Sequence, residues 1–410
     1  FLQQSFCLQV AATQITGVTG NDGIFNIDPT AVNGDVGFRK YNDFNLSEGD
    51  IANLIFNMEG KDVSTFVNMV DNTININGIV NSVNKDGAFN DGRVMFVSPN
   101  GMVVGASGVL NVGSLSVLTP DQGTYDKFKG SVNNPTLAED YENILSAPGT
   151  GTVKIDGKVL ARDFVNINAA NIDIANNAQI LAGVNDATKL VSNKQAENLF
   201  NQLVNSDVVS GSSFANDSGN IVITSYGQNG GTSIGGTVKN IAKNGDIEIT
   251  NSGSNGVNIT GIVSNAGGST TINNTNGAVN ISGSVINRGN DELEGLFINN
   301  RGSGVTIDST GIIDNNNRLE ITNSGKDGIT IAGNVTNKGN VNIKNTAGGI
   351  VISGNLDNTE YDSNGLLAIT NTGDNGILIS GTVSNKANGL TQETSIVNNN
   401  SNSGIEITNT

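Results

Sequence analysis

The chain has 410 residues, and only 14% of them are charged. Its formal net charge is −17, from 21 Lys and Arg against 38 Asp and Glu, and it contains no His and no Trp. A nucleic-acid-binding protein needs a basic stripe, which this sequence does not have, so nucleic acid is excluded as a partner. The acidic residues are spread along the chain, which favours a role in solubility.

Residues 1–12 have the composition of the end of a signal peptide. Apolar residues at 1–2 and 6–8 precede Val10-Ala11-Ala12, which are small residues of the kind found at cleavage positions. The basic start of a signal peptide is missing, so we expect a clipped remnant, with an apolar capping strand as the alternative. No later apolar run is long enough to cross a bilayer. The only cysteine, Cys7, cannot form a disulfide within the chain, which fits export without requiring it.

Residues 13–120 alternate polar and apolar residues as β-strands do, but they do not repeat. The alternation is clearest over 73–81, 93–97, 101–105 and 109–117. Many of the aromatic residues also fall in this block. A dense and irregular core predicts a cap on the open N-terminal end of a β-helix.

A first helical insertion is predicted at about 121–149. The sequence Thr136-Leu137-Ala138-Glu139 has the form of a capping box, in which the side chains of the first and fourth residues bind backbone N–H groups. An apolar helical face follows, and Pro148 ends the helix. The residues of that face are Leu137, Tyr141, Ile144 and Leu145.

A second helical insertion is predicted over 186–214. Ser192 and Gln195 have capping-box spacing, and Val191 is placed to pack onto Ala196 as a hydrophobic staple. The apolar face consists of Ala196, Leu199, Phe200, Leu203 and Val204. We expect both insertions to cover exposed strand faces; docking of a partner protein is the alternative.

Residues 215–410 repeat a short phrase, first seen complete at 256–265. Its closing asparagines stand 22, 28, 22, 21 and 27 residues apart, at Asn265, Asn287, Asn315, Asn337, Asn358 and Asn385. A second phrase, apolar-x-Ile-x-Asn, lies between the copies and ends at Asn251, Asn323, Asn345 and Asn371. A period of this length is typical of a solenoid, in which each unit buries its apolar face only by stacking on its neighbours.

The repeats predict an all-β fold, a right-handed parallel β-helix with an N-terminal cap and two small helical insertions. Alternation rich in Ile and Val, separated by Asn-Gly and Gly-Gly steps, is typical of short strands joined at tight corners. We expect Ile259, Ile281 and Ile331 to point inward, in about seven coils forming a rod of about 35 Å. The recurrent asparagines form either a ladder of stacked amides or corners that need left-handed backbone. The chain stops in mid-phrase at 404–410, so we expect the N-terminal part of a longer protein.

The sequence predicts no catalytic residue, no metal site and no cofactor. Acidic residues in the repeats are scattered, and Asp291, Glu292 and Glu294 fall together in an inserted loop that we expect to be solvated. The calcium-binding nonapeptide is absent, although weak calcium binding by acidic loops stays open. The alternative function is a carbohydrate-active β-helix enzyme, a polysaccharide lyase or hydrolase, which without His would need a pair of carboxylates.

One segment, Gly92–Gly105, closely resembles the Asn-Pro-Asn-Gly segment of the haemagglutination-activity domain, which opens the filamentous haemagglutinin-like exoproteins of two-partner secretion. It contains Ser98-Pro99-Asn100-Gly101. Upstream, Tyr41–Leu46 resembles the family's Phe-x-x-Phe-Asn-Val stretch, and Ala52-Asn53-Leu54-Ile55 follows it. The ending at 112–120 is similar to that of the leukotoxin-type filamentous adhesins.

The resemblance covers roughly residues 13–185, whereas the repeats match the family only in style. It departs from the family at Ser98, where the family has Asn, and the family's earlier Asn-Pro-Asn-Leu motif has no clear counterpart, although Ile51-Ala52-Asn53-Leu54 stands in its place. The secretion-motif residues that the resemblance carries over are Pro99, Asn100, Gly101, Asn42, Phe44 and Asn53.

The resemblance implies a secreted or cell-surface protein that crosses the bacterial outer membrane unfolded, through a β-barrel transporter, and folds outside. Its missing C-terminal regions would then bind a ligand on a host or neighbouring cell; a toxin-delivery stick is a third possibility. Locally, Pro99 fixes φ while Asn100 and Gly101 tolerate positive φ, so these residues predict a turn. That turn either nucleates the first coil or is merely a corner.

Overall fold

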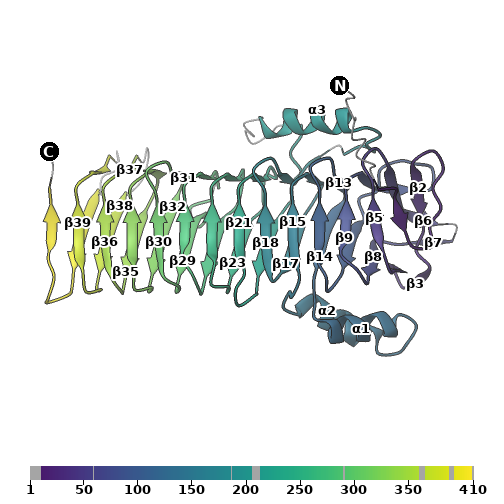
Figure 1. Cartoon of the computed structure of the whole chain (residues 1–410). Coiled ribbons are helices and arrows are strands. Elements are labelled where there is room, and N and C mark those ends of the chain that lie inside the picture. Colours follow the sequence, from purple (N-terminus) through teal and green to yellow (C-terminus); the bar gives the residue numbers. More distant parts are fainter. Residues whose placement is uncertain are drawn as a thin grey trace, which may run out of the picture.

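The computed structural model describes residues 11–58, 60–185, 187–205, 213–289, 291–359, 365–386 and 392–408. Residues 1–10, most of the expected signal-peptide remnant, lie outside the described residues. The chain winds into a rod of three long sheets, with its N- and C-terminal ends at opposite ends of the rod (Figure 1). Among the described residues, no helix has the length and apolar character needed to cross a membrane.

Sheets A, B and C each contain 14 strands within the described part of the chain. Sheet A consists of β1 (Gln14–Ile15), β5 (Phe44–Leu46), β9 (Ile74–Ile76), β12 (Met102–Val104), β15 (Thr152–Ile155), β18 (Asn171–Ile174), β21 (Gly231–Ile234), β24 (Gly256–Ile259), β27 (Val279–Ile281), β30 (Gly304–Ile307), β33 (Gly328–Ile331), β36 (Gly349–Ile352), β39 (Gly376–Ile379) and β42 (Ile405–Ile407). Sheet B consists of β2 (Ile24–Ile27), β6 (Ile51–Met58), β7 (Lys61–Asp62), β10 (Ile79–Asn84), β13 (Val109–Val112), β16 (Lys158–Ala161), β19 (Gln179–Ala182), β22 (Thr237–Asn240), β25 (Ile262–Asn265), β28 (Ser284–Asn287), β31 (Ile312–Asn316), β34 (Asn334–Lys338), β37 (Asn355–Asn358) and β40 (Thr382–Asn385). Sheet C consists of β3 (Ala31–Asn33), β4 (Val36–Tyr41), β8 (Thr65–Val70), β11 (Arg93–Val97), β14 (Ser114–Leu118), β17 (Val165–Ala169), β20 (Ile221–Ser225), β23 (Ile247–Asn251), β26 (Thr270–Asn274), β29 (Gly295–Asn300), β32 (Arg318–Asn323), β35 (Val341–Asn345), β38 (Leu366–Asn371) and β41 (Glu393–Asn398).

Each coil of the solenoid contributes one strand to each sheet and pairs in parallel with the coils on either side. The branched aliphatic residues of the repeats stack in register: Ile259 lies beside Ile281, and both are buried, as is Ile331. A single apolar core runs from Ile15 to Ile379. The predicted parallel β-helix is therefore confirmed, and it extends to about 14 turns, because the non-repetitive first half also forms coils.

A ladder of asparagines runs along the corner that follows sheet C. The side-chain amide of Asn251 donates to Oδ1 of Asn274 at 2.7 Å, and the same bond recurs from coil to coil as far as Asn398. Each amide also closes its own corner, as where Asn251 Nδ2 donates to the Gly253 carbonyl. None of these asparagines has a positive φ, so they form a ladder of amides instead of serving left-handed turns.

A second, interrupted ladder follows sheet B. Asn315, Asn337, Asn358 and Asn385 are joined by amide bonds of 2.6, 3.0 and 3.0 Å. At Asn287 the ladder breaks, and the buried Nδ2 of this residue has no hydrogen-bond partner among the described residues.

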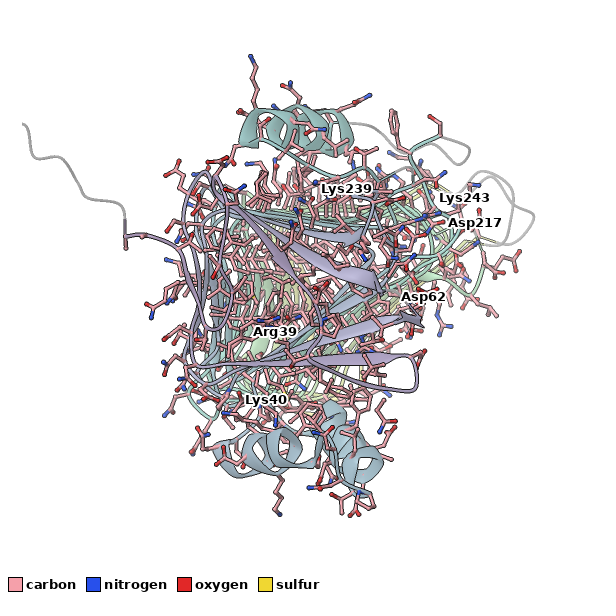
Figure 2. All side chains as sticks on the ribbon, turned by 90° about the vertical axis from the view of Figure 1, so that its right-hand side faces the viewer. Arg39, Lys40, Asp62, Asp217, Lys239 and Lys243 are labelled. Atoms are coloured by element: carbon pink, nitrogen blue, oxygen red, sulfur yellow. The ribbon has the colours of Figure 1, made fainter. Side chains whose placement is uncertain are left out.

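The N-terminal cap is smaller than predicted. β1 pairs antiparallel with β5, and β3 pairs antiparallel with β4. Arg39 lies over the end of the rod (Figure 2) and donates to the Asp28 and Gly17 carbonyls at 2.9 and 2.8 Å. From β4 onward the strands of sheet C pair in parallel, so the prediction of a cap over all of 13–120 is wrong. The aromatic residues there fill regular coils: Phe44 and Phe96 pack edge to face at 5.3 Å.

The first insertion lies between β14 and β15 and covers the outward face of sheet C. It contains two helices, α1 (Gln122–Ser131), which the sequence analysis missed, and α2 (Leu137–Ser146). Phe128 and Ile144 are buried against outward residues of the first coils such as Met95. The predicted capping box at Thr136 is wrong, because this residue is itself in the helical region (φ −79°, ψ −2°) and its side chain makes no cap bond.

The second insertion covers the outward face of sheet B on the opposite side of the rod (Figure 1). Its helix α3 (Asn193–Val204) is capped by Ser192, whose side chain accepts from the Gln195 N–H. The predicted face is confirmed, with Phe200 and Leu203 fully buried and Lys239 beneath the helix, donating to the Val204 carbonyl at 3.0 Å (Figure 2). The staple is wrong, because Val191 remains 60% exposed. Within the described residues, both insertions therefore cover strand faces, as expected.

Candidate functional site

The resemblance motif forms a corner between β11 and β12. The Gly101 N–H donates to the Ser98 carbonyl at 3.2 Å, which closes a four-residue turn. Ser98 Oγ accepts the Asn100 N–H at 3.1 Å and donates to the Asn72 carbonyl at 2.9 Å. A serine hydroxyl that accepts from the backbone two residues onward stabilises such a turn, as an asparagine side chain does. Ser98 therefore keeps the turn although it departs from the family residue.

Gly101 is the one residue of the corner that requires glycine. Its φ is +83°, a region that residues with a side chain rarely adopt. A Cβ atom at this position would lie 2.0 Å from the Thr152 carbonyl oxygen of the next coil. The predicted turn is confirmed, and of the two residues that tolerate positive φ only Gly101, its fourth residue, adopts it.

Asn100 binds the preceding coil through its exposed side chain. Its Nδ2 donates to the Asp71 carbonyl at 2.7 Å, and its own carbonyl accepts from Thr73 Oγ1 at 3.2 Å. Pro99, by contrast, is buried. The corner is therefore fixed to the coil below it by side-chain as well as backbone bonds.

The carboxylate of Asp71 connects the corner to α1. It accepts from Lys129 Nζ at 2.6 Å and from the Tyr125 hydroxyl at 2.9 Å. Burial, and then the hydrogen bond to Asp71, raise the pKa of Tyr125 well above its usual range. The first helical insertion is thus tied to the corner that carries the motif.

Asn42 and Phe44 lie at the same corner, two coils below Pro99. The Asn42 carbonyl accepts from the Asn72 N–H at 3.0 Å, while its side chain is exposed. Phe44 is fully buried and packs edge to face against Tyr41 at 5.4 Å. These two residues and the Pro99–Gly101 turn therefore form one axial stack.

Asn53 does not join this stack, because it lies on sheet B. It belongs to an outward ladder that runs from Asn26 through Asn53 to Asn81 and Asn111, and the sequence analysis did not select the other three residues. Asn81 exchanges two hydrogen bonds with the backbone of Leu190, at 2.9 and 3.0 Å. Asn53 thus belongs to the surface on which the second insertion docks. Four asparagines at one strand position of successive coils were the signal for this surface.

The corner holds few groups capable of chemistry. The carboxylate of Asp71 is paired with Lys129, and that of Asp43 accepts from the Asn72 side chain at 2.9 Å. Within the described ranges, no cluster of three or more His, Cys, Asp or Glu could hold a metal ion. The arrangement closes turns and connects coils, and two side chains, Asn42 and Asn100, face solvent.

A polar groove lies farther along the rod, over β26, β29, β32 and β35 of sheet C. Its volume is about 540 Å³, and asparagines, threonines and two cations, Arg301 and Lys344, line it without any carboxylate. The sequence analysis did not predict it, because its residues are ordinary outward positions of separate repeats.

The fold defines the class of the protein, a parallel β-helix repeat protein, and is consistent with a haemagglutinin-like β-helix. No protein-family model matches the chain, and no curated protein matches it.

Proposed function

We propose that this chain is the N-terminal secretion domain and stalk of a large secreted surface adhesin. The observation that carries the proposal is the Ser98–Gly101 turn, in which residues resembling the secretion motif close a corner and connect it to the coils on both sides. A stalk of stacked coils follows directly on the same core. On this proposal, the protein is located at the bacterial cell surface or is secreted into the medium.

Export proceeds through an outer-membrane β-barrel transporter, and the chain folds outside. The nearest-neighbour pairing of the coils supports this proposal, because a coil can stack on the previous one as soon as it emerges. Stacking outside the cell would then bias transport forward. The adhesin, on this proposal, binds a ligand on a host or neighbouring cell.

The proposed role is not enzymatic. A β-helix glycosidase or lyase needs convergent carboxylates and bases in a groove. The groove on sheet C has no carboxylate lining, and the corner presents amides, which supports a structural role. Release of reducing ends or unsaturated products from acidic or neutral polysaccharides by the purified chain would favour the enzyme instead.

The proposal is tested by changing the two solvent-facing motif residues together, Asn42→Ala and Asn100→Ala, in cells that also express the β-barrel transporter. The secreted fraction should fall several-fold. The matched control is Asn255→Ala with Asn280→Ala, two exposed asparagines of the stalk, which should be exported normally. Equal export of both double variants would show that the motif carries no secretion information.

A further inference from the structure

The groove on sheet C is a continuous polar track along the rod axis. The parallel register places Asn273 beside Asn299, Asn299 beside Thr322, and Thr322 beside Lys344. Successive coils are about 4.8 Å apart, so one polar side chain is presented at each such step. None of the three helices in the described part of the chain covers this stretch of β29, β32 and β35 (Figure 1).

The floor of the groove is ordered before any ligand arrives. Asn299 Nδ2 donates to Asn273 Oδ1 at 3.0 Å, and Thr322 Oγ1 donates to Asn299 Oδ1 at 3.0 Å. All three side chains are half-buried, and their backbones are held in the sheet. A polymer laid along them therefore meets fixed donors and acceptors, which lowers the entropic cost of binding.

Two unpaired cations flank this floor. Arg301 and Lys344 line the groove with exposed side chains, and neither has an ion-pair partner among the described residues. The neighbouring Arg318, by contrast, is paired with Glu320. In a chain of net charge −17, a groove lined by two cations and no carboxylate has a local excess of positive charge.

We propose that this groove binds an acidic linear polysaccharide along the rod axis. The amides and hydroxyls of the floor bond the sugar hydroxyls, and Arg301 and Lys344 bind carboxylate or sulfate groups. Two cations are too few for the backbone of a nucleic acid, which needs an extended basic surface. The absence of lining carboxylates makes the groove a binding site without cleavage. This inference goes beyond the proposed export and does not depend on it.

The test measures binding of the purified full chain to polygalacturonate and heparan sulfate, with neutral dextran as the comparison polymer. We expect binding to at least one acidic polymer, little binding to dextran, and weakening at high salt, because exposed charge contacts are screened. The double variant Arg301→Ala with Lys344→Ala should raise Kd about tenfold or more, since it removes both charge contacts.

The control is Lys338→Ala, at an exposed lysine of β34 on sheet B, outside the groove, with Lys326→Ala to match the two lost charges. If this control weakens binding as much as the groove variant, the attraction is only net charge and the proposal fails. Equal binding of dextran, preferential binding of an acidic peptide, or undiminished binding by the groove variant would also overturn it. Loss of export with intact binding would affect only the secretion proposal.

Discussion

At the scale of single residues, buried amides decide much of the structure. The ladder beside sheet C runs through side chains that are at most 2% exposed between Asn251 and Asn371. A buried polar group without a partner is costly, whereas a paired one is neutral or stabilising. A buried asparagine at this corner therefore needs an asparagine at the same position of the next coil as its hydrogen-bond partner. This requirement explains why asparagine recurs at the corner in each repeat.

Replacing one rung should cost more than one hydrogen bond. Asn300→Ala removes the bonds to Asn274 and Asn323, so each of these two buried amides loses one hydrogen bond that no water can replace. We expect the free energy of unfolding to fall by about 2–4 kcal/mol. Urea denaturation followed by circular dichroism measures it. The exposed control Asn280→Ala should change it by less than about 0.5 kcal/mol; equal losses would contradict a structural ladder.

The corner glycine gives a second residue-scale prediction. Gly101→Ala combines a left-handed φ with a clash against the Thr152 carbonyl, so we expect a loss of more than about 2 kcal/mol. Gly34→Ala has a φ of +61° but no atom within 4 Å of the added Cβ. It should cost only about 1 kcal/mol. Thermal unfolding of both variants compares them, and similar losses would show that the coil contact is unimportant.

Buried tyrosines predict the response to alkaline pH. Burial raises the pKa of Tyr41, whose hydroxyl donates to Asn68 at 2.8 Å, and the pKa of Tyr125. Since the folded pKa lies above the unfolded value of about 10, their contribution is complete below pH 10 and is lost as the pH rises through the folded pKa. The free energy of unfolding should therefore decline above about pH 10. The double variant Tyr41→Phe with Tyr125→Phe should decline less steeply; an identical slope would contradict this.

At the scale of elements, the strands and corners of the repeats follow from the sequence, whereas the helical insertions follow only in part. Alternation around Ile259 identifies the inward face, and Gly256, with φ +69°, marks a corner. The helix α3 is predictable because five apolar residues share one face. In α1 only Tyr125 and Phe128 are large and buried, and two glycines lower the helix propensity. That helix forms because sheet C offers an apolar surface, which local sequence does not reveal.

The candidate site, like the helical insertions, could be predicted from the sequence only in part. Motif resemblance found the Pro99–Gly101 turn and its stack with Phe44. It could not find the ion pair of Asp71 with Lys129, because 58 residues separate the partners and only tertiary packing brings them together. The groove at Asn299 could not be predicted either, because its residues become neighbours only through the register between coils of unequal length.

The second insertion ties distant coils together, which gives an element-scale prediction. The Leu190 backbone bonds Asn81 across 109 residues. Phe200→Ala should cost about 3–5 kcal/mol and raise hydrogen exchange around β10 and β13, because the covering segment loosens. Lys194→Ala, on the exposed side of the helix, should do neither. Exchange mass spectrometry distinguishes the outcomes, and unchanged protection at β10 would contradict the coupling.

At the scale of the whole molecule, the rod has two unlike parts. In the first part, the outward face of sheet C up to Leu118 and that of sheet B up to Ile241 are apolar and covered by helices, which couples coils that are not neighbours. Beyond Ile241, the described coils pair with adjacent coils through the three sheets and the asparagine ladders. On the proposed function, the first part carries the information for export, while the second is a spacer that can be shortened.

This division is tested most directly by comparing export of two deletions in cells that express the β-barrel transporter. One removes residues 13–120; the other removes 252–300, which joins two equivalent ladder positions and so takes out two coils in register. The secreted fraction should fall to background for the first deletion and stay near that of the intact chain for the second. Efficient export of the protein lacking residues 13–120 would contradict the account.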